Sequence, residues 1–164
     1  MNKLKTVFVD RDGVINQERK NYVKSISELD IYPNVAKNIK LLKDKGFLVV
    51  VITNQSAVNR GIVTNEIIDQ IHNSIQDHLK QHGTFLDGFY YCPHKPDENC
   101  NCRKPKSGLL QQAILELNID LNSSWMIGDN DSDIEAATSI GCKAIKISDN
   151  FSLDNAVEKI LNYG

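Results

Sequence analysis

Two carboxylates one residue apart, Asp10 and Asp12, are the residues of this sequence whose type and spacing most directly suggest chemistry. They follow the apolar run of residues 7–9, which is typical of a buried strand, and Gly13 then lets the backbone turn sharply. Crowded carboxylates repel each other unless a cation or a shared proton relieves the repulsion. The pair therefore predicts a metal site, a nucleophile with a partner acid, or both, although a plain turn would also explain Asp12-Gly13 alone.

A second polar group follows the apolar run of residues 47–52, which is typical of a parallel strand buried on both faces. The segment Thr53-Asn54-Gln55-Ser56 carries hydroxyl and amide groups that can bind phosphate oxygens without adding charge. Arg60 in the next loop could add a cation for a second anionic group, and a solvated loop arginine is the alternative. Because ligands of open α/β sheets bind at the carboxyl ends of the strands, we expect these groups to lie near the two carboxylates.

Four candidate zinc ligands lie within eleven residues: Cys92, His94, Cys100 and Cys102. Three thiolates and one imidazole make a complete tetrahedral set for structural zinc, and four protein ligands leave no open position for catalysis. Loop cysteines without a metal are the alternative. The zinc-stapled loop that we predict leads directly into Arg103-Lys104, whose cations it would hold rigidly against a phosphoryl group.

A third carboxylate, Asp129, follows the apolar run of residues 125–127 in the segment Gly128-Asp129-Asn130-Asp131-Ser132-Asp133. Asp133 lies in the first turn of the helix that comes next, where a negative charge is favourable. Carboxylates brought together at a common edge of the sheet suit Mg²⁺, which takes oxygen ligands and keeps some of its waters. We therefore expect a magnesium site at this edge of the sheet.

Strand-like and helix-like segments alternate along the chain. Strands are predicted at residues 7–9, 47–52, 85–91, 125–127 and 144–147, and helices at about 34–45, from Thr64 to Leu79, and at 109–117, 134–140 and 153–161. This alternation predicts one α/β domain, residues 1–164, with a doubly wound parallel sheet. The loop with Tyr22 is a candidate to lie over the site, and we interpret His72, His78 and His82 as ordinary surface residues.

Composition narrows the class of protein. The chain has 164 residues, of which 41% are hydrophobic and 24% charged, with a formal net charge of −2. That charge provides no basic field for nucleic acid, and no apolar run is long enough to span a membrane. Because the first residues lead straight into a strand, we expect no signal peptide and a cytoplasmic, monomeric protein. In a reducing compartment, clustered cysteines favour metal binding over disulfides.

Several of these segments together resemble a known superfamily. Asp10-x-Asp12, Thr53, Lys104 and the run from Gly128 to Asp133 resemble, in order, the four motifs of the haloacid dehalogenase superfamily over nearly the whole chain. The closer resemblance is to its small zinc-loop phosphatases without a cap domain, the heptose 1,7-bisphosphate phosphatases and the histidinol-phosphate phosphatases. Both families share the Asp-Arg-Asp-Gly, Cys-x-His, Cys-x-Cys and Cys-Arg-Lys-Pro patterns. The resemblance implies the Rossmann-like fold of this superfamily and a Mg²⁺-dependent phosphatase.

The resemblance also implies a role for each residue of the site. Asp10 would be the nucleophile that becomes phosphorylated, and Asp12 the general acid and then the general base. Mg²⁺ would be held by Asp10, the carbonyl of Asp12, Asp129 and the neighbouring Asn130, with Asp133 behind them. Zn²⁺ would be held by the four loop residues. The residues expected to bind the phosphoryl group or the substrate are Tyr22, Thr53, Asn54, Gln55, Ser56, Arg60, Arg103 and Lys104.

The substrate that the resemblance implies is a small phosphorylated sugar, D-glycero-D-manno-heptose 1,7-bisphosphate, with the 1-monophosphate as product. The Thr53–Ser56 segment, Arg60-Gly61 and Tyr22-Val23 match the heptose pattern. The short spacer between the two halves of the zinc loop is typical of histidinol-phosphate phosphatases. An amine substrate would need a carboxylate such as Glu18 or Asp97, so this second substrate stays open.

Two further alternatives keep the scaffold and change the function. A catalytically inactive binding module would be indicated by loss of Asp10, Asp12 or Asp129, and all three are present. A nucleic-acid 3′-phosphatase would use the same chemistry, but the slightly acidic chain argues against it.

Overall fold

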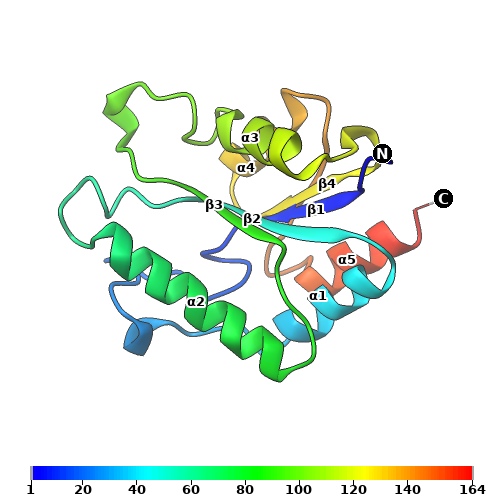
Figure 1. The fold of residues 1–164 in the computed structure, drawn as a ribbon, viewed down its shortest axis with the longest axis horizontal. Coiled ribbons are helices and arrows are strands. Elements are labelled where there is room, and N and C mark those ends of the chain that lie inside the picture. The colour runs from blue at the N-terminus through cyan, green and yellow to red at the C-terminus, as the bar shows by residue number, and fades with distance from the viewer. Residues whose placement is uncertain (1, 164) are drawn as a thin grey trace.

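Five short runs rich in β-branched and aromatic residues form a single parallel sheet in the computed structural model, which describes residues 2–163 (Figure 1). The strands are β1 (Thr6–Val9), β2 (Leu48–Asn54), β3 (Gly88–Cys92), β4 (Trp125–Gly128) and β5 (Lys143–Lys146). Their order is β3-β2-β1-β4-β5, with Val7 of β1 paired to Val49 on one side and to Trp125 on the other. The strand that ends at the two carboxylates is therefore the central one.

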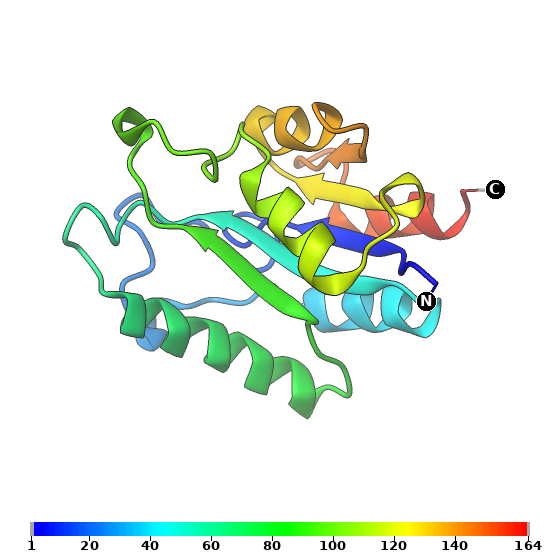
Figure 2. The same ribbon diagram turned by 45° about the horizontal axis from the view of Figure 1, so that its top comes forward.

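Helices cover both faces of the sheet (Figures 1 and 2). They are α1 (Val35–Asp44), α2 (Asn65–Gln81), α3 (Gly108–Leu117), α4 (Asp131–Thr138) and α5 (Leu153–Leu161), with short 3₁₀ turns η1 (Ile26–Glu28), η2 (Pro96–Glu98) and η3 (Leu121–Ser123). Side chains of α1, α2 and α5 pack on one face, and those of α3 and α4 pack on the other, so the core has two layers. None of these helices is both long and apolar enough to cross a membrane.

The predicted α/β class is confirmed: the sheet is parallel, with helices on both faces and no cap domain within residues 2–163. The predicted start of a helix at Thr64 is also confirmed: α2 begins at Asn65, and the Thr64 hydroxyl caps it by accepting a hydrogen bond from the Ile67 N–H at 3.2 Å. The third strand begins at Gly88, three residues later than predicted. There the Asp87 carboxylate accepts from the Val49 N–H at 2.8 Å and from Lys43 at 2.6 Å.

The interpretation of His72 as a surface residue is wrong. Its side chain is buried, with 6% of its surface exposed, and its ring stacks on Phe89 of β3 with 4.5 Å between ring centroids. The residue lies on the same face of α2 as Ile68, Ile71 and Ile75, which are completely buried. The apolar stripe of this helix therefore carried the signal that His72 would be buried.

Candidate active site

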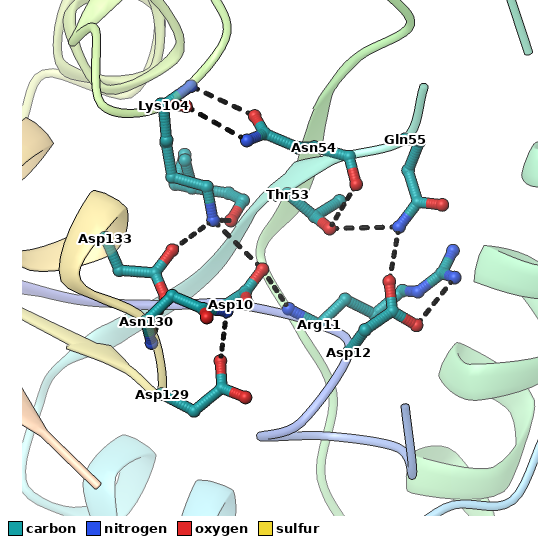
Figure 3. Close-up of polar contacts among 11 residues, drawn as sticks. Asp10, Arg11, Asp12, Thr53, Asn54, Gln55, Lys104, Asp129, Asn130 and Asp133 are labelled. Atoms are coloured by element: carbon teal, nitrogen blue, oxygen red, sulfur yellow. Dashed lines mark hydrogen bonds and ion pairs between the residues drawn. The ribbon is translucent and has the colours of Figure 1, made fainter. Parts of the chain in front are cut away.

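Side chains from four separate segments meet at the carboxyl edge of the sheet (Figure 3). Asp10 and Asp12 follow β1, Thr53 lies near the end of β2, Lys104 comes from the loop after β3, and Asp133 lies in the first turn of α4. They line one cavity of about 460 Å³. Every residue predicted to bind the phosphoryl group or the substrate lines this cavity: Tyr22, Thr53, Asn54, Gln55, Ser56, Arg60, Arg103 and Lys104.

The Lys104 ammonium is buried at the centre of this site. Its Nζ donates to Asp10 Oδ1 at 2.9 Å, to Asp133 Oδ1 at 2.5 Å and to the Ile52 carbonyl at 2.7 Å. Burial opposes the charged form, but the charges of Asp10 and Asp133 outweigh it and raise the pKa of Lys104. The site therefore holds a fixed positive charge beside the predicted nucleophile.

Asp10 and Asp129 form the acidic part of the site. Burial raises the pKa of Asp10 to about 7, with Lys104 opposing the shift and Asp133 adding to it. Burial, followed by the charge of Asp133, also raises the pKa of Asp129. Carboxylate oxygens of these three acids lie within 4.8 Å of one another. Such crowding disfavours the ionised forms, and a hard divalent cation would offset it, so the donor set fits Mg²⁺.

Asp133 and Asn130 support this donor set. The Asp133 oxygens accept from Lys104 Nζ and, at 3.1 Å, from the Asn130 N–H, so both are already engaged. Asn130 Nδ2 donates to Asp129 Oδ1 at 3.1 Å and so orients that carboxylate. Asp10 and Asp129 are therefore the carboxylates that we expect to hold a cation, and the place of Asp133 behind the metal ligands stays a prediction.

Two glycines make room for the carboxylates. A Cβ on Gly13, whose φ is +91°, would lie 2.0 Å from Asp129 Oδ2. A Cβ on Gly128 would lie 2.3 Å from Asp133 Oδ2. Both distances are far inside van der Waals contact, so the acids approach the backbone this closely only because these residues have no side chain.

The Asp12 carboxylate is held by three side chains. Its Oδ1 accepts from Arg11 Nη2 at 3.0 Å and from Asn16 Nδ2 at 2.9 Å, and its Oδ2 accepts from Gln55 Nε2 at 2.7 Å. Burial favours the protonated form, but the Arg11 charge and these hydrogen bonds outweigh it and lower the pKa of Asp12. Asp12 is thus oriented before any substrate binds.

The polar residues after β2 fix their neighbours as well as lining the cavity. Asn54 Oδ1 accepts from the Lys104 N–H at 3.0 Å, and Asn54 Nδ2 donates to the Lys104 carbonyl at 3.2 Å. One amide therefore fixes the backbone of the buried lysine. Gln55 Nε2 donates to Thr53 Oγ1 at 3.0 Å in addition to Asp12. These contacts hold Asn54 and Gln55 in place for their predicted role toward phosphate.

Two arginines at the rim are held by neutral groups. Arg60 Nε donates to Ser56 Oγ at 3.2 Å, and Arg103 Nη1 donates to the His94 carbonyl at 3.2 Å. Because neither contact is an ion pair, neither one neutralises the arginine. These guanidinium groups remain suited to an anionic ligand.

Two further cations of the cavity lie on a loop that was expected to help choose the substrate, but neither was assigned an individual role. Arg19 and Lys20 line it next to Glu18, on the loop that also carries Tyr22. Their place in a loop already expected to lie over the site was the available signal. Asp97, proposed as an alternative carboxylate for an amine substrate, is on η2 and is not among the residues that line the cavity.

The four predicted zinc ligands also come together. Sγ of Cys92 lies 3.2 Å from His94 Nδ1, 3.6 Å from Cys100 Sγ and 2.8 Å from Cys102 Sγ. Burial opposes ionisation of Cys100, but the N–H groups of Arg103 and Cys102 lower the pKa of its thiol to about 6, toward the thiolate that binds metals. Three sulfurs and one nitrogen match structural zinc. Arg103 then links this loop to the cavity through the His94 carbonyl.

Substitution of Cys100 by serine tests the zinc loop. We expect Cys100→Ser to bind far less than one zinc per chain and to lose about 2–3 kcal/mol of stability, which lowers the melting temperature by roughly 5–10 °C. Zinc analysis by mass spectrometry and thermal unfolding measure both effects. Cys142→Ser is the matched control, because Cys142 is buried in the core away from the cluster, and it should keep its zinc. An unchanged zinc content in Cys100→Ser would contradict the assignment.

Comparison with known families identifies what this arrangement resembles. Residues 101–161 match the family model described as HAD-hydrolase-like. The D-glycero-β-D-manno-heptose-1,7-bisphosphate 7-phosphatase of Haemophilus ducreyi is 42% identical in an alignment of 146 positions that covers 85% of this chain and 80% of the relative. The probable D-glycero-D-manno-heptose-1,7-bisphosphate 7-phosphatase of Thermoplasma volcanium is 39% identical over 138 residues, covering 84% of this chain and 94% of the relative.

A solved structure has the same fold. The crystal structure of D,D-heptose 1,7-bisphosphate phosphatase from B. bronchiseptica, complexed with magnesium and phosphate, aligns with a TM-score of 0.89. The alignment covers 96% of this chain and 98% of the other, at 29% sequence identity. Magnesium and phosphate in that crystal are the cofactor and the ion that the donor set described above would accept.

Proposed function

The chain belongs to the family of D-glycero-D-manno-heptose-1,7-bisphosphate 7-phosphatases, and from this premise we propose that it hydrolyses the 7-phosphate of heptose 1,7-bisphosphate and leaves the 1-monophosphate. The observation that carries the proposal is the buried Asp10–Lys104 pair, placed in one cavity with Asp12 and beside Asp129. The product agrees with the expected one, and the proposal treats residues 1–164 as a single phosphatase domain.

In the first step of the proposed reaction, an Asp10 carboxylate oxygen attacks phosphorus while the bond from phosphorus to the sugar oxygen breaks. Hydrogen bonds from Lys104 and from the Arg11 N–H, both 2.9 Å long, hold Asp10 Oδ1, so the nucleophile is oriented in advance. The protonated form of Asp12 gives its proton to the departing sugar alkoxide. The products of this step are the dephosphorylated sugar hydroxyl and phosphorylated Asp10.

In the second step, Asp12 takes a proton from a water molecule as that water attacks the phosphorus on Asp10. The bond between Asp10 and phosphorus breaks, inorganic phosphate leaves, and Asp12 is protonated again for the next cycle. Lys104 and Thr53 would hold the phosphoryl oxygens through both steps. Held by Asp10, Asp129 and the Asp12 carbonyl, with Asn130 beside them, Mg²⁺ would supply positive charge to those oxygens.

Cations around the cavity support a substrate with two phosphates. Arg19, Lys20, Arg60 and Arg103 line it in addition to the buried Lys104, and Glu18 is a single acid on the same rim. When one phosphate of a bisphosphate occupies the catalytic position, its second phosphate can bind these cations. A sugar bisphosphate therefore suits the charge of this cavity better than an amine such as histidinol phosphate.

A substrate panel tests the proposal. Phosphate release with Mg²⁺ would be measured for heptose 1,7-bisphosphate in both anomers, other sugar bisphosphates, histidinol phosphate and a 3′-phosphorylated oligonucleotide. We expect the heptose bisphosphate to give the highest kcat/KM, with one phosphate released per molecule. Preference for histidinol phosphate would keep the mechanism and overturn the substrate. No release from any compound would favour a binding module on this scaffold.

A further inference from the structure

The Arg11 side chain, between the two catalytic aspartates in the sequence, is completely buried although it is charged. It turns away from the cavity: Asp10 and Asp12 line the cavity, and Arg11 does not. A buried guanidinium needs partners that replace water. Two are present, since Nη2 donates to Asp12 Oδ1 at 3.0 Å and Nη1 lies 3.2 Å from His72 Nε2.

The second partner comes from a distant part of the chain. His72 lies in the middle of α2, 61 residues from Arg11. An arginine only donates hydrogen bonds, so His72 Nε2 must accept, and the imidazole must be neutral with its proton on Nδ1. Burial, and then the Arg11 charge, lower the pKa of His72 to about 3, in agreement with this tautomer.

The orientation of the imidazole is fixed by the sheet. Its ring is nearly parallel to that of Phe89, at an interplanar angle of 15°, and the Tyr91 ring meets it edge-on at 5.8 Å. Both aromatic residues belong to β3. Phe89 and Tyr91 therefore hold the His72 ring with its Nε2 facing Arg11. Neither aromatic residue lines the cavity.

The contacts of Asp12 show which part of the site His72 and Arg11 control. Arg11 and Asn16 both donate to Oδ1, whereas Oδ2 accepts only from Gln55 among residues 2–163. Figure 3 shows the contacts from Arg11 and Gln55. The Oδ1 side is anchored in the protein, and Oδ2 keeps the capacity to carry a proton. A rotation of the carboxyl group would exchange these two oxygens.

We propose that His72 is a positioning residue for general acid catalysis: it holds Arg11, and Arg11 holds Asp12 so that Oδ2 presents the proton to the leaving group. The inference rests on the proposed function, because it assumes that Asp12 protonates a sugar alkoxide. His72 itself touches neither the cavity nor the predicted metal ligands. Its effect on catalysis passes through Arg11.

Two variants separate the hydrogen bond from the packing. His72→Phe keeps a ring that can stack on Phe89 but offers Arg11 no acceptor. His72→Gln places an amide oxygen near the position of Nε2 and should restore the contact. His72→Asn, whose shorter side chain cannot reach Arg11, replaces His72→Phe if that variant does not fold. Ile71→Val is the packing control, since Ile71 is completely buried on the same helix and its side chain offers Arg11 no hydrogen-bond acceptor.

The readout compares two leaving groups through kcat/KM, which reports the steps up to phosphorylation of Asp10. A sugar phosphate needs its alkoxide protonated, whereas 4-nitrophenyl phosphate releases a stable phenolate that needs no acid. We expect His72→Phe to lower kcat/KM for heptose 1,7-bisphosphate about 10- to 100-fold, a part of what general acid catalysis contributes, and for the nitrophenyl ester less than about threefold. His72→Gln and Ile71→Val should remain within about threefold of wild type for both substrates.

Equal losses for both substrates, or no loss for either, would overturn the inference. A failed substrate proposal looks different, because the wild-type enzyme would then prefer another phosphate ester, and the leaving-group ratio would be measured with that ester. A crystal structure of His72→Phe gives a readout that needs no substrate. We expect the contact between Arg11 and Asp12 to be lost and the Asp12 carboxyl to rotate, and an unmoved Asp12 would also overturn the inference.

Discussion

Replacing Asp10 by asparagine should reduce phosphate release by at least about 10⁴-fold, because an amide cannot form the acyl phosphate that a carboxylate forms. The fold should survive the change. Asparagine has the same shape, and its Oδ1 can still accept from Lys104 and from the Arg11 N–H as Asp10 does. The measurement is steady-state kcat with Mg²⁺, together with circular dichroism and a thermal melt of the same preparation.

Asp131→Asn is the matched control for this prediction. Asp131 lies on α4, its side chain is 91% exposed, and within residues 2–163 it pairs only with Lys146, so its substitution removes an equal charge outside the cavity. It should keep the kcat of wild type. Rapid acid quench of wild type during turnover should leave phosphate on the peptide that contains Asp10, and Asp10→Asn should carry none. Substantial turnover by Asp10→Asn would remove Asp10 as the nucleophile.

Replacing Lys104 by methionine should damage both catalysis and stability. The buried carboxylates of Asp10 and Asp133 would lose their cation, and the Ile52 carbonyl would lose a donor. Breaking a buried ion pair from one side costs about 3–5 kcal/mol, and losing a preformed positive charge beside the phosphoryl group lowers kcat about 10²- to 10³-fold. Urea unfolding measures the first effect, and the kcat of correctly folded protein measures the second.

Lys43→Met separates these two effects. Lys43 forms an ion pair with Asp87 at 2.6 Å, and both side chains are largely buried, but the pair lies far from the cavity residues in the fold. This variant should lose stability and keep the kcat of wild type. If Lys104→Met lost only as much activity as Lys43→Met, then Lys104 would be a structural residue and not a phosphate ligand.

Much of the site was predictable because the chemistry follows the strands in sequence. Apolar runs marked β1, β2 and β4, and the carboxylates and hydroxyl that follow them, Asp10, Thr53 and Asp129, were expected at one edge. The zinc ligands were predictable for a different reason, since all four come from a single short loop. The local sequence was sufficient to predict the site wherever one segment supplied both the strand or loop and the functional side chain that it positions.

The remaining features depend on contacts between distant segments, which local patterns do not encode. The amide of Asn54 was predicted to bind phosphate. Its hydrogen bond with the Lys104 backbone depends on how β2 packs against a loop 50 residues later. The contact between His72 and Arg11 could not be predicted, because no sequence pattern connects the middle of α2 with the end of β1. The order of the strands was likewise beyond the reach of local patterns, since pairing partners in a parallel sheet are chosen by packing.

The central position of β1 has a consequence for how the protein is made. The Thr6 N–H donates to Ser124 Oγ across 118 residues of sequence, and β4 pairs with β1 along the same edge. The ribosome synthesises β1 and β2 long before β4. The edge of β1 that later pairs with β4 therefore stays unpaired while the residues between β2 and β4 are translated. Asp129 reaches Asp10 only at that late stage. The enzyme thus acquires the two acids predicted to hold its metal close to the end of synthesis, and the exposed edge of β1 is the surface that a chaperone would need to protect until then.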